Sequence, residues 1–118
     1  MNSSDKPFRI PGDQIKRLIP AIGGCFASDR ITVCGMKVGY MYRERPDERF
    51  DSGWRFMSGD ENREYADNAD NWGIYEVNTI CNYDPAIIPY LNAANGTAYV
   101  RIPDTEKFRA EEFEPPDG

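Results

Sequence analysis

The sequence predicts an α+β fold, in which one antiparallel sheet of about five strands carries short helices on one face. Three observations favour this class. The chain has 118 residues, the length of a single domain. Segments such as 38–43, 53–57 and 97–102 have the β-branched and aromatic composition of strands. The prolines, glycines and capping residues between these segments leave room only for short helices.

The N-terminal half begins with a predicted short helix. Asp13 would cap it, Ile15, Leu18 and Ile19 would form its apolar side, and Pro20 would end it. Strands are expected to follow at residues 25–28, 31–33, 38–43 and 53–57.

The strand at 53–57 alternates in a way that defines its two faces. Side chains on a strand point alternately to opposite sides, so Trp54 and Phe56 share one face and Arg55 lies on the other. We expect the two aromatic residues to belong to the core. The preceding residues, 44–52, are charged and contain a proline, and they are predicted to form a loop.

The C-terminal half begins with an acidic stretch at 58–73, predicted to form a long loop or a short irregular helix. Asp84 and Pro85 predict the start of another short helix, because aspartate is a preferred N-cap and proline fits the first helical position. The remaining predicted elements are a strand at 74–75, a helix at 77–83, a turn at 95–96 and a strand at 97–102. Together these elements divide the chain into a lead-in (1–22), an α+β domain (23–102) and an acidic tail (103–118), docked or frayed.

Several kinds of chemistry are disfavoured by the residues that are absent or scarce. The chain has no histidine, so catalysis by Ser-His-Asp or Cys-His groups and metal sites built on histidine are excluded. Cys25, Cys34 and Cys81 are widely spaced and odd in number, which fits buried thiols better than a disulfide framework or a zinc site. We therefore predict no catalytic residues, no metal and no cofactor.

The charge of the chain is negative and unevenly distributed. The net charge is −6, and most of the acidic excess lies in the C-terminal half. Such a surface repels nucleic acids but attracts basic proteins. No segment has the length and apolarity of a membrane span, and the first twenty residues lack the apolar stretch of a signal peptide. The sequence therefore predicts a cytoplasmic protein that binds neither nucleic acid nor membrane.

The acidic stretch is the candidate binding site, because it places aromatic residues among carboxylates. Aromatic side chains fill pockets at protein interfaces, while charges set the register of the partners. Trp72 could alternatively be a core anchor, and the carboxylates a solvated face. Calcium-loop spacing fails in both possible registers, because Trp72 or Tyr65 stands where glycine is required. The predicted contact residues are Asp60, Glu61, Glu64, Tyr65, Asp67, Asp70 and Trp72.

A second polar group lies in a segment that otherwise has the composition of a buried element. It consists of Asn78, Asn82, Tyr83 and Asp84. Residues of these types often hold neighbouring loops through hydrogen bonds to the backbone. We predict a structural role for this group.

Two long runs of sequence carry a resemblance to a known family. They are GWRF followed by SGDE at 53–61, and GIYEVNTI continuing through NYDP to IIP at 73–89. Shorter runs at 24–30, 38–43 and 96–99 support it. Together these runs resemble the bacterial immunity-protein thirty-three family, over residues 23–102.

The resemblance implies an α+β domain that binds a cognate toxin of a bacterial polymorphic toxin system and protects the producing cell. It transfers no catalytic residues. The sequence thus favours a non-enzymatic inhibitor that uses the acidic and aromatic stretch against a toxin with a basic contact surface. The alternatives are a general interaction or regulatory module with another partner and, behind it, a small-molecule binder or enzyme, which would need a deep pocket with convergent polar groups. The oligomeric state is not specified by the sequence.

Overall fold

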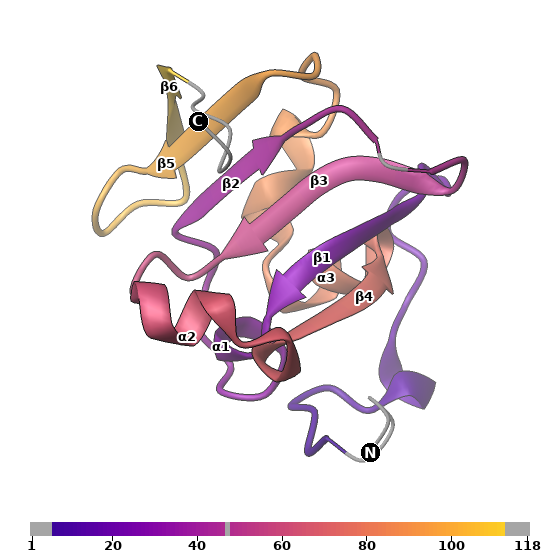
Figure 1. Ribbon diagram of the computed structural model, residues 1–118. Helices are drawn as coiled ribbons and strands as arrows, with labels where there is room; N and C mark the ends of the chain where they lie inside the picture. Colours follow the sequence, from indigo (N-terminus) through magenta and orange to yellow (C-terminus); the bar gives the residue numbers. More distant parts are fainter. Residues whose placement is uncertain (1–5, 47, 113–118) are drawn as a thin grey trace.

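The described residues of the computed structural model, 6–46 and 48–112, form one compact α+β domain (Figure 1). Six strands are found in this part of the chain. They are β1 (Gly24–Ser28), β2 (Tyr40–Arg43), β3 (Asp51–Met57), β4 (Trp72–Glu76), β5 (Thr97–Arg101) and β6 (Phe108–Glu112). They form a single sheet in the order β4-β1-β3-β2-β5-β6. The α+β class predicted from the sequence is therefore confirmed.

Two details of the predicted sheet were wrong. The sheet is mixed rather than antiparallel, because β1 and β3 are parallel while all other neighbouring strands are antiparallel. The chain carries β2 to the far side of β3, and this leaves β1 and β3 as parallel neighbours. The sheet also has a sixth strand, β6, within the segment predicted to be a tail.

The sixth strand is held by aromatic contacts. The Phe108 side chain is buried, and its ring centre lies 5.2 Å from that of Tyr90. The Tyr90 hydroxyl also accepts a hydrogen bond of 3.0 Å from the Phe108 amide. One apolar side chain in an otherwise charged stretch thus provides the burial that fixes the strand. Residues 113–118, which include the two final prolines of the predicted tail, lie outside the described residues.

The helices are short, and α3 (Val77–Tyr83) lies behind the sheet in Figure 1. Its prediction at 77–83 is confirmed, as is the capping role of Asp84, whose carboxylate accepts a hydrogen bond of 3.1 Å from the Ala86 amide. Residues 58–73 contain two short helices. The remaining helices are α1 (Asp29–Thr32), α2 (Arg63–Asp67) and the 3-10 helices η2 (Gly12–Gln14), η3 (Ala69–Asn71) and η4 (Pro85–Tyr90).

Two predicted elements were replaced by others. The strand expected at 31–33 is replaced by the end of α1 and its C-cap Val33, because the Ser28 side chain caps the helix at the Arg30 amide and Ile31 fits into the core. The helix expected from Asp13 is only the single turn η2. The amides of the following residues are not free for a helix, since Lys16, Leu18 and Ile19 donate to asparagine side chains of α3.

The core lies between the sheet and α3. Trp54 and Phe56 are fully buried there and stack with ring centres 5.9 Å apart, as predicted for this face of the strand. Arg55 points to the opposite face, where its guanidinium group lies 4.5 Å from the ring centre of Phe26. The face that carries α3 therefore holds the core, and the opposite face of the sheet is turned toward the viewer in Figure 1.

Candidate functional site

The predicted contact residues lie in a segment of 13 residues, 60–72, here called the acidic segment. It connects β3 to β4 and folds into α2 and η3. Asparagine side chains start both helices: Asn62 accepts a hydrogen bond of 2.7 Å from the Tyr65 amide, and Asn68 accepts one of 3.0 Å from the Asp70 amide. The asparagines thus satisfy backbone donors that a short helix leaves unpaired. The acidic segment is therefore ordered by its caps although its sequence is polar.

The two aromatic residues of the acidic segment are half-buried and hold it in place. The Trp72 indole N–H donates to the Ala66 carbonyl at 3.0 Å. The Tyr65 ring lies under the guanidinium group of Arg30, 4.6 Å from its centre. Asn71 donates to the Tyr65 carbonyl at 2.9 Å. Both rings therefore support the segment from within and leave only part of their surface for a partner.

Two of the predicted carboxylates are engaged within the chain. Glu61 accepts hydrogen bonds of 2.9 Å from the amides of Ser58 and Gly59. Partial burial opposes its ionisation, but these bonds and one from the Ser28 hydroxyl outweigh that effect and lower the pKa of Glu61. Asp60 accepts a hydrogen bond from Ser58 and lies 3.5 Å from Arg30.

Three other carboxylates remain available. Glu64, Asp67 and Asp70 are exposed, and none of them forms an ion pair with the described residues. They lie on or beside α2 and η3, whose positions are fixed by the caps and ring contacts above. The segment therefore presents negative charge from an ordered backbone, a suitable arrangement for meeting a positively charged surface.

The second predicted group has side chains that bind the backbone of the N-terminal segment. Asn78 accepts hydrogen bonds from the Leu18 and Ile19 amides at 2.7 and 3.1 Å. Asn82 accepts one from the Lys16 amide at 2.9 Å. The Tyr83 hydroxyl accepts one of 3.1 Å from the amide of residue 10. These bonds attach residues 10–19 to α3.

Asp84, the last member of this group, connects the junction of α3 and η4 with strand β5. Its carboxylate is fully buried and accepts a hydrogen bond of 3.0 Å from the Val38 amide. It also forms an ion pair with Arg101 of β5. The charge of this buried carboxylate is compensated by a cationic partner and amide donors, so removing one partner would leave an uncompensated buried charge.

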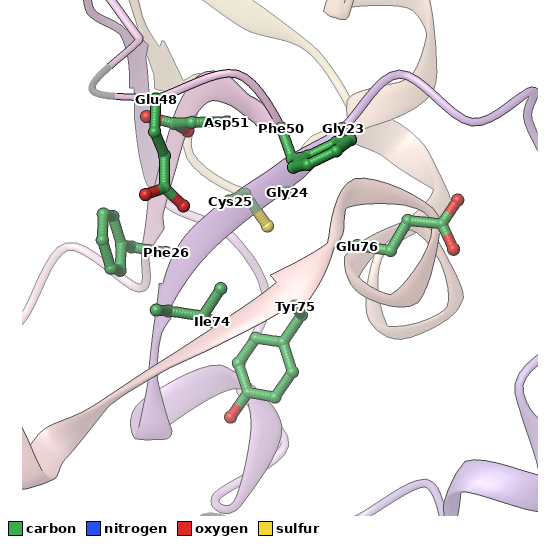
Figure 2. A pocket seen from close by; sticks show the side chains of 10 residues that line it. All are labelled: Gly23, Gly24, Cys25, Phe26, Glu48, Phe50, Asp51, Ile74, Tyr75 and Glu76. Carbon is green, nitrogen blue, oxygen red and sulfur yellow. The ribbon is translucent and has the colours of Figure 1, made fainter.

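The structure also contains a hollow that was not predicted from the sequence (Figure 2). It lies where the N-terminal end of β1 meets the C-terminal end of β4, and its volume is about 560 Å³. We call it the β1–β4 hollow. Its lining consists of Gly23, Gly24, Cys25, Phe26, Glu48, Phe50, Asp51, Ile74, Tyr75 and Glu76.

The cysteine in the lining is not poised for nucleophilic chemistry. Burial raises the pKa of the Cys25 thiol well above its ordinary value, and burial raises that of Cys81 to about 11. Both residues are buried as predicted, whereas Cys34 is exposed. At neutral pH the two buried thiols are protonated and serve as small apolar side chains.

Comparison with known families decides the identity of the domain. The Immunity protein Imm33 domain matches the chain over residues 25–112. The chain belongs to this family. No curated protein and no solved structure is significantly similar to it. The Imm33 domain of this chain extends from β1 to β6 and contains the whole acidic segment.

The described part of the Imm33 chain lacks two other kinds of site. No helix there combines the length and apolarity needed to cross a membrane. No group of three histidine, cysteine or acidic side chains there is arranged to hold a metal ion. The acidic segment and the β1–β4 hollow are candidate binding surfaces of the described residues.

Sequence reasoning missed three residues that shape these surfaces. Arg30 supports the acidic segment from α1, while Phe50 and Ile74 flank the hollow. Phe50 has a local signal, since it is a lone aromatic residue at the end of a charged loop. Arg30 and Ile74 have none, because their contacts come from elements distant in the chain.

Proposed function

We propose that this Imm33 domain is a non-enzymatic immunity protein that binds a cognate toxin of a polymorphic toxin system and blocks it in the cytoplasm of the producing cell. Family membership supports the immunity role in general. The observation that supports the finer proposal is the acidic segment, in which three exposed carboxylates form no ion pair with the described residues and stand on an ordered backbone. Such carboxylates are free to meet lysine and arginine side chains of a partner.

The mechanism we propose is steric and electrostatic. Glu64, Asp67 and Asp70 attract a basic surface of the toxin and set its register, and the exposed edges of Tyr65 and Trp72 add apolar contact. Where that surface is the cleft in which a toxin holds an anionic substrate, the carboxylates take the place of the substrate charges. Asp60 and Glu61 contribute mainly by holding the segment, because their charges are engaged with Arg30 and with backbone amides.

The first experiment is to capture the partner from lysate of the source cells with the tagged chain and to elute it with a salt gradient. We expect a toxin domain with a basic surface, released by salt and inactivated by one equivalent of the chain. Capture of a protein that is not a toxin would instead favour a general regulatory module.

A charge reversal then tests the acidic segment itself. Asp67→Lys together with Asp70→Lys should slow association with the captured toxin about tenfold or more and weaken its dependence on salt. The matched control reverses two exposed carboxylates outside the segment that also form no ion pair with the described residues, Asp13→Lys and Asp104→Lys. Equal association rates for the wild type and the segment variant would remove the acidic segment from the interface.

A further inference from the structure

The β1–β4 hollow lies at the opposite end of its strand pair from the acidic segment. In the register of this pair, Ser28 faces Trp72 at one end and Gly24 faces Glu76 at the other. Four residues of extended strand separate the two ends, which corresponds to about 13 Å. A protein interface of ordinary size covers about 800 Å² on each partner, so one partner can reach both features.

The walls of the hollow expose more apolar surface than a solvated surface requires. Phe50 is 77% exposed and Ile74 is 72% exposed, the highest values among the large apolar side chains of the described residues. Figure 2 shows the two side chains on different sides of the hollow, with Phe26 also at its edge. Exposed apolar side chains grouped around a concavity are typical of interaction sites.

The hollow is held open by backbone contacts. The Gly24 amide donates to the Phe50 carbonyl at 2.7 Å, which places the loop before β3 directly beside β1. Gly23 has a φ of +116°, and a Cβ atom there would lie 2.8 Å from the Phe50 carbonyl oxygen. Glycine is therefore required for this close approach. Phe50 reaches its position without help from a partner, so the site is present before binding.

The edge of the hollow at Phe26 is fixed by ionic contacts. The Phe26 ring packs against the Arg55 guanidinium group, which is bound by Glu44 at 2.6 Å and by Asp51 at 2.8 Å. Arg55 is nearly fully buried, and its charge is compensated by these two carboxylates. The Phe26 side chain is therefore held in one orientation.

Among the described residues that line the hollow, one carboxylate is available to a cationic partner. The side chains of its lining that are charged at neutral pH are the carboxylates Glu48, Asp51 and Glu76. Asp51 is bound to Arg55 and Glu76 to Arg17, whereas Glu48 is exposed and forms no ion pair with the described residues. Arg49 lies over the Phe50 ring at 5.8 Å, yet the ring stays largely exposed. An apolar group next to a cation fits this combination, because it covers Phe50 and Ile74 while the cation meets Glu48.

We propose that the β1–β4 hollow receives an aromatic or aliphatic side chain of the toxin, carried by a segment that also contains lysine or arginine. This inference rests on the proposed function and extends its interface from the acidic segment along β4. A polar metabolite fits less well, because two of the three carboxylates are already bound to arginines and the remaining wall is apolar.

Two blocked tripeptides, Lys-Trp-Lys and Glu-Trp-Glu, test the chemistry of the hollow without the toxin. In NMR titrations of the full chain, the basic peptide should shift the amide signals of residues 23–26, 50–51 and 74–76, with at least threefold tighter binding than the acidic one. Ile74→Ser should abolish these shifts. Ile102→Ser, a change at an exposed isoleucine outside the hollow, should not.

The outcomes of this titration separate the possible occupants. Equal shifts with both peptides, or none at these residues, would overturn the proposal. If the same signals move with protein concentration alone, a second copy of the chain occupies the hollow, and the proposal is also wrong. Shifts that follow the basic peptide and disappear in Ile74→Ser support it.

The complex with the captured toxin provides a second test. Phe50→Ser with Ile74→Ser should weaken binding about tenfold or more, mainly through faster dissociation, because lost apolar contact changes the lifetime of a complex. The matched control is Met36→Ser with Ile102→Ser, two exposed apolar residues outside the hollow. Unchanged affinity of the hollow variant would overturn this inference alone. Failure of the wild-type chain to bind any toxin would instead contradict the proposed function.

Discussion

The carboxylates of this Imm33 domain fall into two regions with opposite surroundings. Asp51 in β3 and Asp84 between α3 and η4 are bound to Arg55 and Arg101 and accept backbone hydrogen bonds. On α2 and η3, carboxylates such as Asp67 are exposed and have no ion pair within the described residues. Carboxylates of equal charge therefore have different roles. Those bound to Arg55 and Arg101 stabilise the fold, and those exposed on α2 and η3 are available to a partner.

The largest effect is expected at Asp84. Asp84→Ala should lower the free energy of unfolding by about 3 to 5 kcal/mol, because it removes the buried carboxylate that pairs with Arg101 and leaves the Val38 amide without an acceptor. Urea denaturation measures this loss, with Asp67→Ala as the exposed control. If Asp84→Ala does not fold, Asp84→Asn, which keeps an acceptor oxygen, should fold with a smaller loss. A loss below about 1 kcal/mol for either variant would remove the contrast between the two regions.

A smaller effect is expected at the Arg55 cluster. Asp51→Ala should lower the free energy of unfolding by about 2 to 3 kcal/mol, because it removes two hydrogen bonds to the buried guanidinium group while Glu44 remains bound. Glu44→Gln should lose less, about 1 kcal/mol, since Glu44 is more exposed than Asp51. A larger loss of stability for Glu44→Gln than for Asp51→Ala in chemical denaturation would show that Glu44 is the main partner of Arg55.

Glu61 lies in the acidic segment, but its carboxylate accepts hydrogen bonds from backbone amides, as the structural carboxylates do. Glu61→Gln should lower the free energy of unfolding by about 1 kcal/mol at pH 7. The pKa of Glu61 is lower in the folded chain than in the unfolded one, so its stabilising effect is full above the unfolded pKa. That effect is lost as the pH falls through the folded pKa. The difference in free energy of unfolding between the wild type and Glu61→Gln should therefore shrink in acid. A difference that does not depend on pH would contradict this assignment.

The smallest effect on stability is expected in the acidic segment itself. Asp67→Lys with Asp70→Lys should change the free energy of unfolding by no more than about 0.5 kcal/mol, since both side chains are exposed and unpaired within the described residues. Thermal unfolding followed by circular dichroism measures this. If the variant keeps its stability but loses toxin binding, the carboxylates of the acidic segment act in binding and not in folding. A large destabilisation would place these carboxylates with the structural group.

Local sequence signals determined several elements correctly. The alternation of Trp54 and Phe56 predicted β3 and its core face, and the Asp84–Pro85 pair predicted the start of η4. The run from Val77 predicted α3. In each case the information lies within a few consecutive residues, because caps and side-chain alternation act over that range.

Tertiary contacts decided what local patterns could not. The β-branched residues at 31–33 favour a strand, but the cap at Ser28 and the core around Ile31 select a helix. Residues 15–19 favour a helix, but asparagines of α3 take their amide hydrogens. Strand order likewise depends on partners far apart in the sequence, so the parallel pairing of β1 and β3 has no local signal.

For the candidate site, the sequence by itself determined where acidic and aromatic residues are concentrated and to which family the domain belongs. Only the tertiary structure decided which carboxylates are free. Glu61 and Asp67 have the same charge, but only Glu61 reaches the backbone amides of Ser58 and Gly59. The β1–β4 hollow arises in the same way. Phe50 and Ile74 line the same hollow only because the loop before β3 and the strand β4 lie on either side of β1. Burial and pairing depend on such distant contacts.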